Sequence, residues 1–595
     1  MVALLFFLLL VPFALGQTPS FTGLDRAAKL KAAIPDVETV IRKWAAQRGV
    51  PGMSWGMVID GETVAVKTLG MRQWPDKLPV ETGTPFRIAS MTKSFTALAV
   101  LKLRDEGKLS LDDEVARWIP EAARLRYPTS DTAPLRVRQL LTHSAGFPED
   151  NPWGDQQLSL PFADLTRWLE RGIPFSTPPD TAYEYSNYGF GLLGRIVERV
   201  SGRSYREYLE SEILRPLGMT SSTLEPAEAK DAAVGYRRIG GAGGEYRLEP
   251  SLPHGAFGAM GGLVTTAPDL AKYVAFHLAA YPPRDGAEQG PVRRASVREM
   301  QRLWRYSGLA VRRDQPESAL AAQAGGYGYG LRVASDCRFG HVVAHGGGLP
   351  GFGSYMMWLP EHGVGLFAMT NLTYAGPAAA LSDAFDVLRR TGALEPRTWP
   401  PSPALMAAQQ ALFALWNEWK PEQAARVAAN NLFLDKSAAD RQAEIVALKK
   451  TVGRCELAGP VRAENWLRGE FDLTCERGSI VRMGLTLAPT APEPAVQYWS
   501  VRAIQPFGAA MRKAAERVAA GKIAGGAFQA RLEAFKRAYG GSCKLGPVLG
   551  GDGGRQGTVR LECAKGKADV ELGLDAKGRT TGVSIVNAAG EACVP

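Results

Sequence analysis

The residue pair best suited to chemistry in this sequence is a serine followed three positions later by a lysine. Ser90 and Lys93 form the only S-x-x-K in the chain, within FRIASMTKSF. At positions i and i+3 of a helix, two side chains share one face, with about 5–6 Å between their Cβ atoms. A serine hydroxyl is a weak nucleophile that needs a base. The spacing therefore indicates nucleophilic catalysis, with Ser90 as nucleophile and Lys93 as base.

The segment around this pair must hold the serine hydroxyl toward a substrate and the lysine in its neutral form. A helix is predicted over residues 90–106, because Phe95, Leu98 and Leu101 form one stripe and Gly107 follows. At the start of that helix the Ser90 N–H would be unpaired and would face incoming negative charge. Desolvation and nearby cations can lower the lysine pKa from about 10.4.

Two further motifs could complete such a site. Tyr185 and Asn187 form the only Y-x-N, directly before a helix predicted over 187–201. The tyrosine could relay a proton if Lys93 acidified its phenol, and the asparagine could bind a substrate amide. His345 begins a run of glycines at the end of a predicted strand, where a substrate could lie along the strand edge. Taken singly, these motifs also fit a core aromatic residue, a helix N-cap and a glycine-rich turn.

Other motif matches are weaker. Residues 52–56 fit the G-x-S-x-G nucleophile elbow, which requires a strand before it and a helix after it. Here Pro51 precedes the motif and a hairpin over 54–68 follows, so Ser54 is interpreted as a strand residue. Residues 346–351 fit G-x-G-x-x-G, but Pro350 interrupts the match and no helix follows. The six histidines show no metal-binding spacing, so neither a metal nor a cofactor is expected.

The elements around these motifs predict a mixed fold over residues 24–395. Helices are predicted at both ends, beginning with 37–48, and the middle is helical. The predicted late strands cover 327–333, 341–345, 354–359 and 365–370. This order indicates a sheet domain with an inserted helical domain.

In sequence order, S-x-x-K, Y-x-N and basic-x-Gly resemble the serine β-lactamase and DD-peptidase superfamily. The nearest likeness is to class C β-lactamases and their esterase and peptidase relatives, over about residues 24–390. Further landmarks are LLTHSAG at 140–146, PLGM at 216–219, GGLVTT at 261–266 and FAMTN at 367–371. The resemblance implies an α+β fold in which helices flank an antiparallel sheet, with a helical subdomain.

The resemblance also implies a role for each motif residue. Ser90 matches the nucleophile, Lys93 its base and Tyr185 the acid/base. Asn187 matches the ligand of the substrate amide. In place of the usual K-T-G stand His345, Gly346 and Gly347, and the N–H groups of Ser90 and Gly348 would form the oxyanion hole.

His345 departs from the lysine of class C enzymes and is similar to some peptidases and esterases. A histidine is only partly protonated near pH 7, which weakens the positive charge offered to a substrate carboxylate. Lys93 nearby should lower the His345 pKa further. We therefore expect a neutral His345 that hydrogen-bonds Tyr185 or the substrate. Efficient β-lactamase activity is not expected. Neutral esters or amides should react about as readily as those that bear a carboxylate.

The rest of the chain has a different organisation. Residues 396–403 hold four prolines and read as a linker, followed by a module over 404–595. The module repeats itself, in copies of about 404–490 and 491–595, and a helix is predicted before each cysteine pair, at 438–452 and 526–539. Equal spacing predicts the disulfides Cys455–Cys475 and Cys543–Cys563; Cys337 and Cys593 are left over, and a bond between them is one option.

The N-terminus bears on the cellular location. Residues 1–16 read as a signal peptide, because their apolar core is short and ends in small residues, and no later segment looks transmembrane. A secreted or periplasmic protein is therefore expected, without a membrane anchor after cleavage. The formal charge is +10, from 70 basic and 60 acidic residues without blocks of one sign, so no nucleic-acid partner is expected.

These observations lead to one functional prediction and one alternative. The chain is predicted to be an exported serine hydrolase that cleaves an amide or ester through a Ser90 acyl-enzyme. Its substrate would be a D-amino-acid peptide, a β-lactam or a small ester, and cell-wall association is possible. The alternative is a catalytically weak binding or scaffold protein of the cell envelope that kept the β-lactamase fold.

Overall fold

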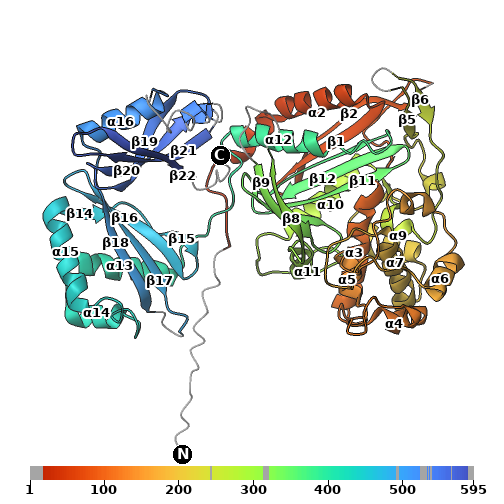
Figure 1. The fold of residues 1–595 in the computed structure, drawn as a ribbon, viewed down its shortest axis with the longest axis horizontal. Helices are drawn as coiled ribbons and strands as arrows, with labels where there is room; N and C mark the ends of the chain where they lie inside the picture. Colours follow the sequence, from red (N-terminus) through yellow and green to blue (C-terminus); the bar gives the residue numbers. More distant parts are fainter. Residues whose placement is uncertain are drawn as a thin grey trace, which may run out of the picture. The chain divides into compact units, whose positions relative to one another are not determined.

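The computed structural model describes residues 18–595 except 75, 241–243, 313–320, 491–494, 523–531, 534, 537–538, 565 and 587–595. The predicted signal peptide therefore lies outside the described residues. The chain divides into two compact units (Figure 1). One contains the described residues of Gly23–Pro316 and Leu320–Pro396; the other contains those of Arg397–Pro595, with the described residues before Gly23.

The first unit is built on a nine-stranded antiparallel sheet. Its strand order is β3-β2-β1-β13-β12-β11-β10-β9-β8. The strands are β1 (Gly52–Ile59), β2 (Glu62–Gln73), β3 (Leu78–Pro79), β8 (Arg305–Arg312), β9 (Ala321–Tyr327), β10 (Arg332–Asp336), β11 (Gly340–Leu349), β12 (Phe352–Leu359) and β13 (Val364–Thr370). The α+β fold class with an antiparallel sheet is confirmed.

Helices cover both faces of this sheet, and strand residues alternate between the two cores. On β12, Met356 and Trp358 pack into one core while Met357 and Leu359 pack into the other. The helices α2 (Ile34–Arg48) and α12 (Ala378–Arg390) lie side by side on one face (Figure 1). On the other face lies α10 (Ala267–Ala279).

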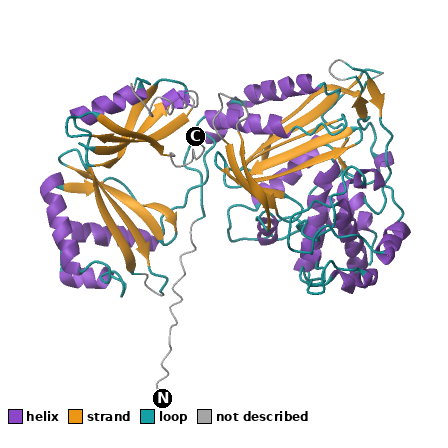
Figure 2. Cartoon of the chain, in the orientation of Figure 1, coloured by secondary structure: helices purple, strands orange, loops and turns teal. Residues whose placement is uncertain are grey.

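A helical subdomain packs beside α10 and carries most of the site (Figure 2). Its helices are α3 (Thr92–Asp105), α4 (Val115–Trp118), α5 (Val137–Leu141), α6 (Phe162–Arg171), α7 (Asn187–Ser201), α8 (Tyr205–Leu209) and α9 (Gly258–Gly261). The remaining α-helices and strands of this unit are α1 (Arg26–Ala32), α11 (Arg294–Met300) and the short pairs β4 (Phe86–Arg87) with β7 (Val264–Thr265) and β5 (Tyr236–Arg238) with β6 (Tyr246–Leu248).

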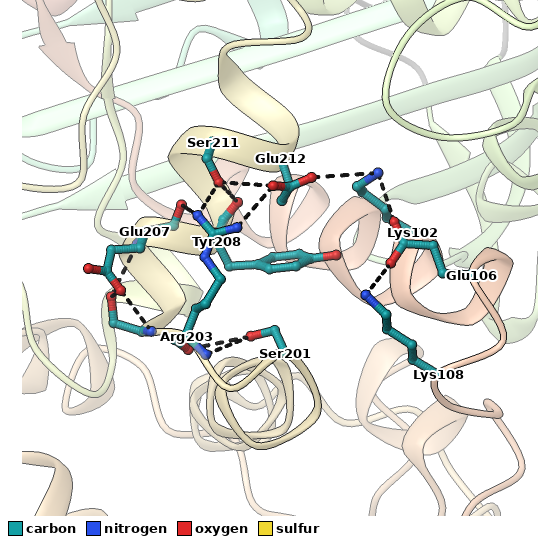
Figure 3. Close-up of polar contacts among 10 residues, drawn as sticks. Lys102, Glu106, Lys108, Ser201, Arg203, Glu207, Tyr208, Ser211 and Glu212 are labelled. Atoms are coloured by element: carbon teal, nitrogen blue, oxygen red, sulfur yellow. Dashed lines mark hydrogen bonds and ion pairs between the residues drawn. The ribbon is translucent and has the colours of Figure 1, made fainter.

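A charged network at the surface links α3 to the segment after α7. Glu212 is approached by Lys102 from one side and by Arg203 from the other, at 3.7 and 2.9 Å (Figure 3). Lys102 also reaches Glu106 at 2.9 Å, and Glu207 completes a capping box at the start of α8. Ion pairs at the protein surface contribute about 0–1 kcal/mol each, so apolar packing remains the main support of the subdomain.

The second unit consists of two antiparallel sheets, each with its own core. The helices α13 (Pro403–Asn417), α14 (Pro421–Val427) and α15 (Ala438–Val452) accompany β14 (Cys455–Leu457), β15 (Arg462–Asn465), β16 (Arg468–Cys475), β17 (Ile480–Leu487) and β18 (Val496–Ile504). The helix α16 (Ala509–Ala519) accompanies β19 (Cys543–Gly551), β20 (Gln556–Cys563), β21 (Gly566–Leu574) and β22 (Thr580–Val586). Most of the helix predicted over 526–539 lies outside the described residues.

Both predicted disulfides are confirmed. Cys455 lies opposite Cys475 in the pairing of β14 with β16, and Cys543 lies opposite Cys563 in the pairing of β19 with β20. The equivalent placement reflects the internal repeat, since each cysteine of the second copy follows its counterpart by 88 residues. Cys593 falls outside the described residues, so its pairing is not addressed.

The repeats also share a cross-strand ion pair, but with its charges exchanged. In the first copy Asp472 of β16 lies opposite Arg482 of β17, with Arg482 Nε and Asp472 Oδ1 at 2.7 Å. In the second copy Arg560 of β20 lies opposite Asp569 of β21, with the corresponding distance at 2.8 Å. Each arginine makes two parallel hydrogen bonds to its carboxylate.

Among the boundaries that differ from the sequence-based expectation, two lie beside the nucleophile. The strand predicted over 327–333 is wrong, because β9 ends at Tyr327 and β10 begins at Arg332. Gly330 between them has a φ of +67°, and its Cα lies so near α3 that a Cβ would meet the Lys93 carbonyl oxygen at 2.6 Å. The helix predicted from Ser90 begins at Thr92, after a 3-10 turn.

No helix within the described ranges is long and apolar enough to cross a membrane.

Candidate active site

Ser90 lies in a buried 3-10 turn, η1 (Ala89–Met91), at the start of α3. The preceding Ala89 has a φ of +50°, in the left-handed region that costs an L-residue about 1–2 kcal/mol. Neighbouring elements fix the turn: the Ile88 N–H donates to the Leu263 carbonyl, and the Ser354 hydroxyl donates to the Ile88 carbonyl at 2.8 Å. Strain supported from two sides in this way is typical of functional turns.

Lys93 is fully buried one turn further along α3, and its ammonium group makes three hydrogen bonds. The acceptors are Ser90 Oγ at 3.1 Å, Asn187 Oδ1 at 2.7 Å and the Met260 carbonyl at 2.8 Å. Burial lowers the pKa of Lys93 to about 7, although the carboxylates of Asp155, Asp150 and Glu149 oppose this shift. The structure thus brings the predicted nucleophile and base into direct contact.

Asn187 begins α7 and is buried behind the pocket rather than on its wall. Its Oδ1 accepts from Lys93, and its Nδ2 donates to Asn151 Oδ1. Asp150 accepts from the N–H groups of Asn187 and Tyr188 at 2.7 and 2.8 Å and so caps α7. Both ends of the Asn187 amide therefore have partners within the protein, and its role as a substrate ligand stays a prediction.

Tyr185 is hydrogen-bonded to Ser90 and lies against the lysine, with Lys93 Nζ 4.8 Å from its ring centre. Burial raises the pKa of Tyr185 well above its usual value, while the Ser90 hydrogen bond and the Arg332 charge act in the opposite direction. The condition for the relay, a phenol acidified by Lys93, is therefore not met, because desolvation outweighs both the Ser90 hydrogen bond and the Arg332 charge. A raised pKa keeps the phenol protonated near pH 7, so it can donate a hydrogen bond.

His345 lies on β11 and uses both ring nitrogens within the protein. Nε2 is 2.6 Å from the Tyr327 hydroxyl and Nδ1 is 2.6 Å from the Gly346 carbonyl. Burial, then the charges of Arg332 and Lys93, lowers the pKa of His345 well below 6.5. A neutral His345 agrees with the sequence-based expectation, but its protein partner is Tyr327 and not Tyr185.

The glycines of β11 allow the strand to lie against the nucleophile turn. A Cβ on Gly347 would meet the Ile88 carbonyl oxygen at 2.0 Å and Ser354 Oγ at 2.4 Å. A Cβ on Gly348 would meet the Tyr374 ring at 2.6 Å. Ser90 and Gly348 line the same cavity, which the predicted oxyanion hole requires.

That cavity has a volume of about 600 Å³ and is lined by groups of both charges. Arg332 contributes a cation, with its guanidinium carbon 5.9 Å from the Tyr185 ring centre. Glu149 and Asp155 contribute carboxylates. The full lining consists of Ser90, Glu149, Asn151, Pro152, Asp155, Tyr183, Tyr185, Arg332, His345, Gly346, Gly348, Tyr355 and Tyr374.

Comparison with known proteins identifies the family of this chain. The family model for Beta-lactamase matches residues 37–389, more than half of the sequence. The chain belongs to the Beta-lactamase family. The resemblance deduced from the three motifs is therefore confirmed.

Individual relatives are more distant. The chain is 28% identical to Protein flp of Staphylococcus aureus (strain COL) over 342 residues, 56% of this chain and 62% of that protein. It is 31% identical to Beta-lactamase-like protein 2 of Dictyostelium discoideum over 262 residues, 42% of this chain and 46% of that one. The chain thus spans less than two thirds of the length of these curated relatives.

A solved structure, the octameric penicillin-binding protein homologue from Pyrococcus abyssi, aligns with 93% of this chain and 98% of its own. The TM-score is 0.49 and the sequence identity is 21%.

Several residues of this family site were not foreseen from the sequence. Arg332 begins β10, the strand that pairs with β11, which carries His345 and its glycines. Asp155 lies in the short turn η3 (Gly154–Gln157), and its sequence neighbourhood carries no recognisable signal. Across the described part of the chain, no group of three or more His, Cys, Asp or Glu side chains is placed to hold a metal ion.

Proposed function

We propose that this chain is an exported serine hydrolase that cleaves an amide or ester through an acyl-enzyme on Ser90. The observation that carries the proposal is the 3.1 Å contact between Lys93 Nζ and Ser90 Oγ, made by a lysine whose pKa is lowered to about 7. About half of such lysines are neutral at that pH, whereas a lysine with a pKa near 10.4 would be almost fully protonated.

The residues divide the reaction as follows. Ser90 Oγ attacks the substrate carbonyl while its proton passes to neutral Lys93. The N–H groups of Ser90 and Gly348 stabilise the negative oxygen of the tetrahedral intermediate. Tyr185 donates its proton to the leaving group and recovers one from Lys93, since burial keeps its phenol protonated. Water then attacks the acyl-enzyme in the same way and releases the acid.

Location and partners form part of the same proposal. Two disulfides support export, because disulfides persist in oxidising compartments. The substrate would be a small molecule or peptide that fits a cavity of about 600 Å³, and association with the cell wall stays one candidate. D-amino-acid peptides, β-lactams and small esters remain the candidate substrates.

Labelling with a fluorophosphonate and with a fluorescent penicillin, followed by peptide mapping, tests the proposal. The label is expected on the peptide that contains Ser90 and should disappear in Ser90→Ala. Ser54→Ala is the matched control, because Ser54 is buried on β1 with its hydroxyl 3.5 Å from the Lys67 carbonyl. Ester hydrolysis at the wild-type rate in Ser90→Ala would contradict the mechanism. A folded protein without label or activity would favour the binding or scaffold alternative.

A further inference from the structure

His143 is hydrogen-bonded to the backbone on both sides of Tyr185. Its carbonyl oxygen accepts from the Glu184 N–H at 2.9 Å, and its ring nitrogen Nδ1 accepts from the Ser186 N–H at 3.1 Å. Glu184 and Ser186 are the immediate neighbours of Tyr185 in the chain. A single residue, two positions after the end of α5, therefore holds the tyrosine segment at two points.

The imidazole ring of His143 also packs against the Tyr185 phenol. The two ring centres are 4.2 Å apart, and the Tyr327 ring centre lies 4.5 Å from that of His143. His143 is only 2% exposed, and the lining of the cavity, as far as the structure describes it, does not include this residue. His143 is therefore placed to act on Tyr185 and not on the substrate.

The bond to Ser186 assigns the tautomer of the ring. A backbone N–H can only donate, so Nδ1 accepts and the proton of the neutral ring lies on Nε2. Burial, followed by the charge of Lys93, lowers the pKa of His143 well below 6.5, which keeps the ring neutral near pH 7. Nε2 is buried and has no hydrogen-bond partner among the described residues. The polar contact of this side chain in the described structure is therefore its bond to Ser186.

The backbone of His143 has an uncommon conformation. Its φ is +54°, in the left-handed region that residues other than glycine seldom adopt. Such a conformation persists where the surrounding structure holds it, and it is frequent at functional sites. The carbonyl and ring bonds to the Tyr185 segment provide that support at this position.

We propose that His143 is a positioning residue that holds the Tyr185 hydroxyl where it can protonate the leaving group. This inference rests on the proposed hydrolase function and deepens its acid step. Without the Nδ1 acceptor the Ser186 N–H would be buried and unpaired, which is costly, so the segment that carries Tyr185 would shift. A misplacement of about 1 Å at a reacting group can cost about 100-fold in rate.

The test uses p-nitrophenyl propionate and ethyl propionate, which share an acyl group. Nitrophenolate leaves without a proton whereas ethoxide requires one, so the ethyl ester depends more on Tyr185 as donor. The ratio of nitrophenyl to ethyl kcat/KM should rise at least about tenfold in His143→Phe, which keeps a ring but removes the acceptor. In His143→Asn the ratio should stay within about threefold of wild type, because Oδ1 replaces Nδ1 as acceptor and asparagine tolerates the left-handed region.

A double variant shows whether His143 acts through Tyr185. Tyr185→Phe removes the proton donor and should raise the same ratio, and adding His143→Phe should raise it no further. His277→Phe is the matched control, since His277 is also fully buried, its Nε2 also lacks a partner among the described residues, and it lies outside the described cavity lining. It should leave the ratio unchanged.

Circular dichroism establishes folding, and His143→Ala replaces the phenylalanine variant if that protein does not fold. An equal loss for both esters in His143→Phe would overturn the inference, because a purely structural role lowers both rates alike. A further rise of the ratio in the double variant, or an equal rise in His143→Asn and His143→Phe, would overturn it as well. Failure of the hydrolase proposal looks different: nitrophenyl ester hydrolysis would then survive Ser90→Ala.

Discussion

The His345 imidazole and the Tyr327 hydroxyl share a 2.6 Å hydrogen bond that joins β11 to the end of β9. The other ring nitrogen, Nδ1, faces the Gly346 carbonyl, which can only accept. Nδ1 must therefore carry a proton, and in the neutral ring Nε2 accepts from Tyr327. The tautomer of His345 is thus fixed by its two partners, and burial keeps the ring neutral near pH 7.

Replacing this histidine tests its place at the carboxylate end of the site. His345→Lys should raise kcat/KM for a carboxylate-bearing reporter relative to its methyl ester by about tenfold. A tenfold change is near the low end of the effect of a charge-assisted hydrogen bond. A small effect is expected because Arg332 and Lys93 disfavour another cation at this position. The matched reporter pair is measured in both proteins. A ratio that is unchanged or lower would show that the third motif is misaligned.

Arg332 supplies the fixed cation that the sequence-based interpretation missed. Arg332→Gln should lower the same carboxylate-to-methyl-ester ratio by about tenfold, because the guanidinium lines the cavity on the side of Tyr185. Arg42→Gln, on the exposed side of α2, serves as control and should have no effect on the ratio. If both variants behave alike, Arg332 does not contact the substrate carboxylate.

The pKa of Lys93 predicts the pH dependence of the reaction. The neutral base accumulates as the pH rises through about 7, so kcat/KM for a propionyl ester should rise and then level off above that pH. His345 adds no step in this range, because its pKa is lowered well below 6.5. Rates from pH 5 to 9, with enzyme stability checked at each pH, provide the measurement. A flat profile would indicate that Lys93 is not the base.

The lowered pKa of Lys93 also makes the free energy of unfolding depend on pH. Between pH 7 and 10.5 the unfolded chain keeps a proton on Lys93 that the folded chain has released, so this group makes folding more favourable as the pH rises. Lys93→Met should lose that increment. Denaturant unfolding at pH 7 and pH 9.5 in both proteins gives the comparison, and an identical gain in the two proteins would be the contrary result.

The contact between β11 and the nucleophile turn predicts a sensitive glycine. Gly347→Ala should lower kcat/KM at least tenfold while the protein stays folded, because its Cβ would press on the Ile88 carbonyl and displace the turn that holds Ser90. Gly83→Ala is the control, since its Cβ meets nothing within 4 Å and its φ is not in the left-handed region. Circular dichroism establishes folding for both. Full activity in Gly347→Ala would mean that the turn adapts.

The disulfides of the second unit predict a loss of stability on removal. Closing a 20-residue separation contributes about 3 kcal/mol. The double variant Cys455→Ala with Cys475→Ala should lower the unfolding free energy by about that amount, and digestion of the unreduced wild type should yield the peptides joined by both bridges. Alkylation of all four thiols in native, freshly exported protein would disprove the pairing.

The helices predicted best from the sequence are those whose first and last residues are marked by nearby capping residues. The helix over 187–201 was predicted to the residue, because Ser186 caps it and Gly202 ends it in the left-handed region. The helix over 438–452 was predicted equally well, with Ser437 as its cap. Ser90 and Lys93 could also be recognised from local sequence, because residues three positions apart on a helix share one face.

Features that depend on distant parts of the chain could not be predicted. Asp155 lies in a short turn and Arg332 at the start of a strand, and the fold brings both to one cavity. The sequence around either residue contains no motif that predicts this. Burial raises the Tyr185 pKa against nearby cations, a balance that only the packed site reveals. The break between β9 and β10 follows from the contact of Gly330 with α3.

The exchanged ion pairs of the second unit bear on how a duplicated sequence avoids exchanging strands between its copies during folding. If β16 paired with β21 in the equivalent register, Asp472 would face Asp569; if β20 paired with β17, Arg560 would face Arg482. Each hybrid sheet would place like charges directly opposite, which is destabilising, whereas each native sheet joins opposite charges. Misassembly is a characteristic failure of repeat proteins. The reversed order of the charges in the second copy therefore favours pairing of each strand with its neighbour in the same copy.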